Sequence, residues 1–173
     1  MKECQKKVKN ILAICWGMQV AVTAAGGVVK KGQNGSHRGI AHEININDNG
    51  LRHPLYKDKD QIFNTPAFNY DEVVTLPNNA TLLSSNKINN VMGIDFKSHL
   101  ANIWGIQYHP EITYEKMITL INFRKERLLE NKSFNDENDL NSHIKIIEDE
   151  IKITPKDLRM RELKNWLNLI ANV

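Results

Sequence analysis

Residues 8–17 read VKNILAICWG, in which a short apolar run, ILAI at residues 11–14, is followed by a cysteine, a tryptophan and a glycine. An apolar run without polar interruptions is typical of a strand buried inside a parallel sheet. The residues that follow, 18–25, favour a helix, and Gly26 and Gly27 end it. This stretch therefore predicts a strand, a turn at Cys15 and a helix, which is the first unit of an α/β fold.

Outward from this unit, the chain alternates short apolar segments with turn residues. Strands are predicted at residues 40–46, 73–76, 81–83, 91–96 and 103–108. Beyond Thr113 the apolar residues recur at helical spacing, and Thr154 with Pro155 begins a last helix. We therefore expect an α/β fold, an open mixed sheet with flanking helices over residues 1–132, and a helical C-terminal extension over residues 133–173 that packs on it.

The composition is that of an ordinary soluble protein. Of 173 residues, 41% are hydrophobic and 25% are charged, which is enough to form a core and excludes global disorder. A net charge of +3 without a basic stripe argues against a nucleic-acid partner, and no apolar run approaches the length of a membrane span. Two cysteines make no disulfide framework, so we expect a reducing, cytoplasmic location.

The sequence carries no pattern that binds a metal or a nucleotide. His37 and His42 have no cysteine partner, and we interpret them as loop and strand residues rather than as metal ligands. A GxxxxGK[ST] phosphate loop is absent from the sequence. We therefore expect no cofactor and no metal, and any ATP-dependent step needs another polypeptide.

Cys15 stands where a nucleophile elbow is expected. In such an elbow a strand turns sharply into a helix and strains the nucleophile, and bulky side chains two positions to either side would clash, so small residues are expected there. Ala13 and Gly17 meet this requirement. The N-terminus of the helix favours a thiolate, and its amides, that of Trp16 among them, can stabilise an oxyanion. The alternative is an unreactive, buried structural cysteine.

His109 and Glu111 supply the other groups that a cysteine nucleophile needs. They follow the predicted strand at residues 103–108, and Pro110 makes the chain leave the sheet there. Because ligands bind at the carboxyl ends of strands in open parallel sheets, His109 and Cys15 can meet at that edge. Glu111 can accept the other ring N–H of His109, which completes a nucleophile, a base and an orienting acid. The alternative is a surface histidine beside a solvated carboxylate.

Two sequence blocks resemble the signatures of class I (triad) glutamine amidotransferases: LAICWGMQVAVTAAGG at residues 12–27 and WGIQYHPE at residues 104–111. Residues 66–85 resemble the loop and strand between those blocks. The segments GIA at 39–41 and KNWL at 164–167 are similar to the stand-alone, GMP-synthase-like branch. The resemblance implies the flavodoxin-like amidotransferase fold.

In that family several strands and helices precede the nucleophile strand, and one of their loops is rich in glycine and supplies a second oxyanion amide. Here fourteen residues precede Cys15. The resemblance therefore implies a chain without its N-terminal part, with Met1 as an internal methionine or a mis-set start and residues 1–9 as the end of a helix. The strand at residues 8–15 then becomes an unprotected sheet edge, which favours aggregation.

The resemblance also implies a role for each site residue. Cys15 attacks the side-chain carboxamide of L-glutamine to form a γ-glutamyl thioester, His109 protonates the departing ammonia and then activates water, and Glu111 orients His109. The residues implied to bind the substrate are Trp16, Gln19, Phe68, Asn69 and Tyr70. Asn69 stands where the family commonly carries a histidine.

The function that the resemblance implies is a glutaminase that makes ammonia for a synthase-type acceptor reaction such as GMP synthesis. Its partner is then an ammonia-accepting synthase subunit. One alternative is a γ-glutamyl peptide hydrolase, which uses the same triad on a bulkier γ-linked substrate. Another is a truncated, inactive fragment or binding subunit. The sequence leaves the oligomeric state open.

Overall fold

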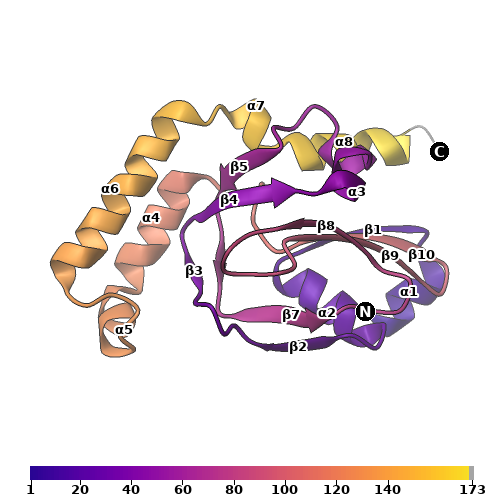
Figure 1. Ribbon diagram of the computed structural model, residues 1–173, viewed down its shortest axis with the longest axis horizontal. Coiled ribbons are helices and arrows are strands. Elements are labelled where there is room, and N and C mark those ends of the chain that lie inside the picture. Colours follow the sequence, from indigo (N-terminus) through magenta and orange to yellow (C-terminus); the bar gives the residue numbers. More distant parts are fainter. Residues whose placement is uncertain (172–173) are drawn as a thin grey trace.

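Within residues 1–171, which the computed structural model describes, the centre of the protein is a six-stranded sheet (Figure 1). The strand order is β1 (Asn10–Ile14), β10 (Ala101–Ile106), β9 (Gly93–Ser98), β8 (Thr81–Ser85), β4 (Ala41–Ile46) and β5 (Ile62–Thr65). β1 pairs in parallel with β10, whereas the other neighbours are antiparallel. The predicted α/β fold with an open mixed sheet and flanking helices is confirmed.

β1 lies at the edge of the sheet, and in the described part of the chain no strand pairs with its outer side. Of its five residues only Ala13 is buried, which agrees with the unprotected edge expected for this strand and not with a strand buried inside the sheet. A short helix, α1 (Lys2–Lys7), precedes it and agrees with the helix end expected there. The expected aggregation at this edge stays a prediction.

One face of the sheet packs against α2 (Trp16–Ala24), which follows directly on β1. Met18, Ala21 and Val22 of α2 are buried in a cluster that includes Ile103 of β10. A Cβ atom added at Gly105 would lie 2.7 Å from Met18 Cγ, so the absence of a side chain there lets α2 lie close to β10. This close packing fixes the direction in which the start of α2 points.

The other face packs against a short 3-10 helix, η1 (Pro54–Tyr56), and the last helix, α8 (Arg161–Ala171). Tyr56 and Tyr108 are buried there, and Trp166 and Leu169 of α8 pack against the same cluster. A further short helix, α3 (Asp48–Leu51), follows β4. Burying one large side chain of this kind stabilises the fold by about 1.5–3 kcal/mol.

Two small ribbons lie beside the main sheet. β2 (Val28–Lys31) pairs with β7 (Asp71–Thr75), and β3 (His37–Arg38) pairs with β6 (Phe68–Asn69). The sequence predicted β7 in part, from residues 73–76, but it missed the two-residue strands β3 and β6. These two strands have too few residues to show an alternating pattern.

The C-terminal third is helical, with α4 (Tyr114–Phe123), α5 (Lys125–Glu130), α6 (Glu137–Ile153) and α7 (Lys156–Arg159) before α8. α4 and α6 lie side by side away from the sheet (Figure 1), around a separate apolar cluster that contains Ile121 and Ile147. The division at residues 132 and 133 stays a prediction. Within residues 1–171, no helix has the length and hydropathy that a membrane crossing requires.

Two predicted boundaries are wrong in a way that matters for the site. β10 ends at Ile106 rather than at residue 108, so His109 does not directly follow the strand. α2 begins at Trp16 rather than at residue 18, so Cys15 is the residue that caps this helix. The first shift moves the end of β10 away from His109, and the second brings the start of α2 next to Cys15.

Candidate active site

Cys15 connects β1 to α2 in a strained backbone conformation. Its φ is 51° and its ψ is −114°, a positive φ that costs a non-glycine residue about 1–3 kcal/mol. The Cys15 amide donates a hydrogen bond of 2.7 Å to the carbonyl oxygen of Ile106, which ties the turn to the end of β10. The predicted sharp turn is therefore present, and Cys15 is 9% exposed.

The steric reason given for the small residues around Cys15 holds on one side only. Ala13 is buried among apolar side chains on the α2 face of the sheet. A Cβ atom added at Gly17 would meet no heavy atom within 4 Å outside the local helix backbone, as far as residues 1–171 are concerned. Crowding by the described residues therefore does not explain the glycine at position 17, and that expectation is wrong here.

The first turn of α2 lies directly after the cysteine. The amides of the first turn of a helix have no acceptor within the helix, and they carry partial positive charge. The Trp16 amide belongs to this set, whereas the Trp16 side chain is 74% exposed. The arrangement can stabilise negative charge at the Cys15 sulfur or on an oxygen bound beside it.

His109 lies between Cys15 and Glu111. Its Nδ1 atom is 2.7 Å from Glu111 Oε1, and its amide donates to the carbonyl oxygen of Pro66 at 2.8 Å. Burial alone lowers the pKa of His109, but hydrogen bonds and charge attraction from Cys15 and Glu111 outweigh burial and raise that pKa to about 9. Because Nδ1 is engaged by Glu111, we assign the contact with Cys15 to Nε2. The structure thus brings the three predicted residues together.

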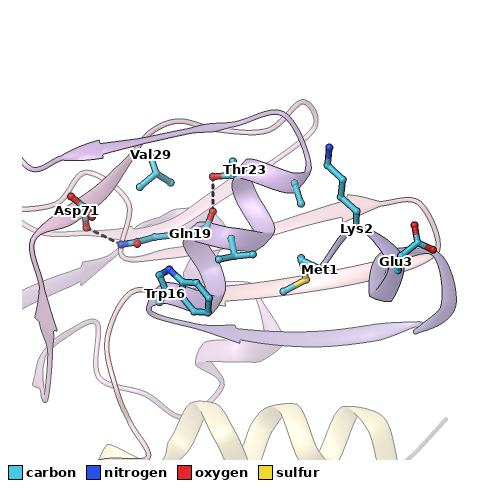
Figure 2. A pocket seen from close by; sticks show the side chains of 10 residues that line it. Met1, Lys2, Glu3, Trp16, Gln19, Thr23, Val29 and Asp71 are labelled. Carbon is cyan, nitrogen blue, oxygen red and sulfur yellow. Dashed lines mark hydrogen bonds between the residues drawn. The ribbon is translucent and has the colours of Figure 1, made fainter.

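Gln19 is buried, and its side-chain amide is used inside the protein. Its Nε2 atom donates to the carbonyl oxygen of Asp71 at 2.9 Å and to Gln107 Oε1 at 3.1 Å (Figure 2 shows the contact with Asp71). Gln107 Nε2 in turn donates to Cys15 Sγ at 3.5 Å. Gln107 is a site residue that the sequence analysis missed. Its place two residues before His109 in WGIQYHPE was the available signal.

The predicted substrate loop contacts the cysteine through its backbone. The carbonyl oxygen of Phe68 lies 3.9 Å from Cys15 Sγ, and the rings of Phe68 and Tyr70 meet edge to face at 6.0 Å between centroids. Asn69 is buried and its side chain is held by internal hydrogen bonds to the carbonyl oxygen of Asp71 and to Asn89. Of the three loop residues, Asn69 therefore serves the structure of the loop.

His37 holds Asn69 from the other side and was also missed. It lies on β3, and its Nδ1 atom is 2.7 Å from Asn69 Oδ1 while its Nε2 atom is 3.0 Å from Asn86 Nδ2. Burial lowers the pKa of His37, so the ring is neutral, with Nδ1–H donating to Asn69 and Nε2 accepting from Asn86. No sequence pattern identifies this pair, because strands β3 and β6 meet only in the folded chain.

A cavity of about 710 Å³ lies next to this site, between α1, α2 and the ribbon of β2 and β7. Figure 2 shows Trp16 and Gln19 on one side of it, and on another Met1 and Glu3, which lie just before and within α1. Cys15 and His109 do not line this cavity. The cavity is therefore separate from the Cys15 turn, although Trp16 and Gln19 of α2 line it.

Comparisons with known proteins agree on one family. The sequence profile of "Glutamine amidotransferase class-I" matches residues 1–125. Over 106 residues the chain is 32% identical to a γ-glutamyl-L-1-hydroxyisopropylamide hydrolase from Pseudomonas sp., covering 60% of this chain and 36% of that protein. Over 116 residues it is 35% identical to one subunit of the glutamine-hydrolysing GMP synthase from Methanosphaera stadtmanae, covering 64% of this chain and 58% of that protein.

A solved structure agrees on the fold. A glutamine amidotransferase from Thermotoga maritima superposes with a TM-score of 0.72 at 21% identity, covering 99% of this chain and 66% of that one. This likeness extends over the helical C-terminal part as well as the sheet. The chain spans between about a third and three fifths of the length of the two curated relatives.

Proposed function

The chain belongs to the class-I glutamine amidotransferase family, a family of enzymes, and from this premise we propose that it hydrolyses the side-chain amide of L-glutamine to glutamate and ammonia. The observation that carries the proposal is the position of His109, which Cys15 engages on one side and Glu111 on the other at 2.7 Å. A nucleophile, a base and an orienting carboxylate in this order are the components of a catalytic triad.

In the proposed reaction, the thiolate of Cys15 attacks the carbonyl carbon of the glutamine side chain. The pKa of about 9 means that His109 is protonated at neutral pH, so it can give its proton to the departing nitrogen. Ammonia leaves and a γ-glutamyl thioester remains on Cys15. The neutral His109 then takes a proton from a water molecule whose oxygen attacks the thioester, which releases glutamate and restores the thiolate and imidazolium.

The Trp16 amide is the proposed donor to the oxyanion that forms during each attack. One donor of this kind is worth about 100- to 1,000-fold in rate. Cys15 is the residue directly before the first turn of α2, so the Trp16 amide lies next to the nucleophile in the chain, which supports the assignment. Gln19, Phe68, Asn69 and Tyr70 remain the proposed substrate-binding residues, with Gln19 and Asn69 acting through the backbone that they hold.

Ammonia release fits a synthase-type acceptor reaction such as GMP synthesis. The supporting observation is the 35% identity to one subunit of a glutamine-hydrolysing GMP synthase, a name that implies a second subunit in that protein. A separate ammonia-accepting synthase subunit is part of the proposal, as is a cytoplasmic location.

A second candidate is hydrolysis of a γ-glutamyl amide with a larger amine. The similarity to the γ-glutamyl-L-1-hydroxyisopropylamide hydrolase favours it, and the same triad serves both reactions. The two candidates differ in the leaving group that the site accepts. A third reading is an inactive fragment or binding subunit, in which the three residues persist without turnover.

The test is to treat the purified chain with a glutamine-mimicking diazoketone, which alkylates activated thiols, and to locate the label by peptide mapping. Cys4 is an exposed free cysteine and Cys15 is buried, so Cys4 is a built-in control for unspecific alkylation. We expect label at Cys15 only, together with ammonia release from glutamine that exceeds amine release from a γ-glutamyl alkylamide. A faster γ-glutamyl alkylamide reaction would select the second candidate, and an unlabelled, folded chain would select the third.

A further inference from the structure

Arg159, at the end of α7 in the C-terminal helical part, reaches the loop that carries Glu111. Its side chain is buried, and its Nη1 atom donates hydrogen bonds to the carbonyl oxygens of Pro110 and of Ile112, the latter at 2.8 Å. These two residues flank Glu111 in the sequence. One guanidinium nitrogen therefore bridges the backbone on both sides of the carboxylate that contacts His109.

The loop between β10 and α4 has few other restraints of this kind. The amide of His109 donates to Pro66, and the amide of Ile112 donates back to His109 at 3.2 Å. The Glu111 side chain itself is 38% exposed, and its contact with His109 Nδ1 is its hydrogen bond within the site. The position of the Glu111 carboxylate thus depends on where the backbone of residues 110–112 is held.

The same C-terminal part also binds the side chain of Tyr108, the residue before His109. Glu162 of α8 is buried, accepts a hydrogen bond of 2.7 Å from the hydroxyl of Tyr108, and pairs with Lys59 at 3.1 Å. Arg159 and Glu162 therefore hold the chain on both sides of His109. Burying a cation costs free energy unless the cation is hydrogen-bonded. Moving the Arg159 guanidinium away from its carbonyl partners would therefore be unfavourable.

We propose that Arg159 is a positioning residue for the catalytic triad: it fixes the loop of residues 110–112 so that Glu111 keeps its contact with His109. The proposal rests on the proposed function for its catalytic consequence, but its structural core concerns only Arg159, Glu111 and His109. It gives the helical C-terminal part a role at the active site beyond packing on the sheet.

The test combines Arg159→Met with Glu111→Gln. We expect Arg159→Met to lower kcat for glutamine by about 10- to 100-fold with KM changed by no more than about twofold, because the misplaced group orients a base and does not bind substrate. In the Glu111→Gln background the same substitution has no further effect, because the carboxylate that Arg159 positions is already gone. If the two losses multiplied in the double variant, Arg159 would act independently of Glu111 and the proposal would be overturned.

A second readout does not need turnover. The pKa of His109 is raised to about 9 in part by Glu111, so NMR titration of the His109 ring in Arg159→Met is expected to give a lower pKa than in the parent chain. The groups that face His109 in this titration are Cys15 and Glu111, and those beside Arg159 include Tyr114, Glu115 and Lys156. An unchanged His109 titration would overturn the proposal.

Two further variants keep the result interpretable. Lys156→Met removes the same charge from an exposed position on the same helix and is expected to leave kcat and the His109 titration unchanged. Arg159→Lys retains a cation and is expected to recover part of the loss, so it replaces Arg159→Met if the latter does not fold. A parent chain that neither releases ammonia nor takes the diazoketone label would refute the proposed function, whereas the His109 titration would still decide the role of Arg159.

Discussion

His109 Nδ1 lies 2.7 Å from Glu111 Oε1, and the two residues are joined by a loop that Pro110 turns away from the sheet. This contact orients the imidazole so that its other nitrogen faces Cys15. The pair therefore connects a loop carboxylate to a cysteine at the end of a different strand. Its consequences can be measured in the pH dependence of both stability and rate.

The stabilisation that His109 contributes is expected to fall as pH rises. The pKa of His109 is raised from 6.5 to about 9, so the stabilisation is fully present below about pH 6.5 and is lost as pH rises through about 9. Glu111→Gln removes part of this effect. Urea denaturation at about pH 6 and about pH 9.5 gives the free energy of unfolding of the parent chain and of Glu111→Gln. The difference between the two chains should therefore be smaller at the higher pH. A constant difference would contradict the assignment of the pair.

Ammonia release from glutamine is expected to decline above pH 9 for the same reason, because deprotonated His109 has no proton for the leaving nitrogen. A profile of kcat/KM against pH in the parent chain measures this decline, which forms the alkaline limb of the profile. In Glu111→Gln the limb should move to lower pH. A limb that stays in place would mean that a group other than His109 supplies the proton.

Cys15→Ala is expected to abolish ammonia release while the fold persists, because the sulfur is the proposed nucleophile and alanine fits the same space. Cys4→Ala serves as the matched control at an exposed position and should retain the parent rate. Ammonia assays on both variants, with circular dichroism to verify folding, give the answer. Parent-level release by Cys15→Ala would remove Cys15 from the mechanism.

His37→Leu is expected to destabilise the chain by about 1–3 kcal/mol, because it removes one hydrogen-bond partner from the buried amide of Asn69 and one from the half-buried amide of Asn86. The pKa of His37 is lowered, mainly by burial, so in the parent chain the stabilisation by neutral His37 is present above about pH 6.5 and lost as pH falls. The difference between the parent chain and His37→Leu should therefore shrink in acid. Urea denaturation at neutral and acidic pH measures it, and an equal loss at both would contradict the buried neutral ring.

Gly105→Ala and Gly17→Ala are expected to behave oppositely. A Cβ atom at Gly105 would lie 2.7 Å from Met18 Cγ and 2.8 Å from Ile94 Cγ2, and such overpacking costs about 1–3 kcal/mol. A Cβ atom at Gly17 meets nothing within 4 Å outside the helix backbone, and alanine in a helix is favoured over glycine by about 0.5–1 kcal/mol. Thermal unfolding of both variants tests this, and a loss of stability in Gly17→Ala would mean that residue 17 is more crowded than the described chain shows.

Much of the fold could be predicted from local patterns. The strand, turn and helix around Cys15, the alternation of later strands and the helical C-terminal part all follow from periodicity and turn residues within short windows. The two-residue strands β3 and β6 could not be found in this way, because their pairing depends on residues 37 and 69 meeting across the chain. The end of β10 at Ile106 was also missed, because long-range contacts decide where the chain leaves the sheet.

The sequence by itself determined the identity of the chemical groups: a cysteine at a strand-to-helix turn, and a histidine and a glutamate two residues apart after a later strand. Only the tertiary structure decided which groups hold them, namely Gln107 against Cys15 and Arg159 against the Glu111 loop. The reason is physical. A strained turn is determined by residues that are adjacent in the sequence. A buried hydrogen bond between residues about fifty positions apart forms only after packing has excluded water from both partners.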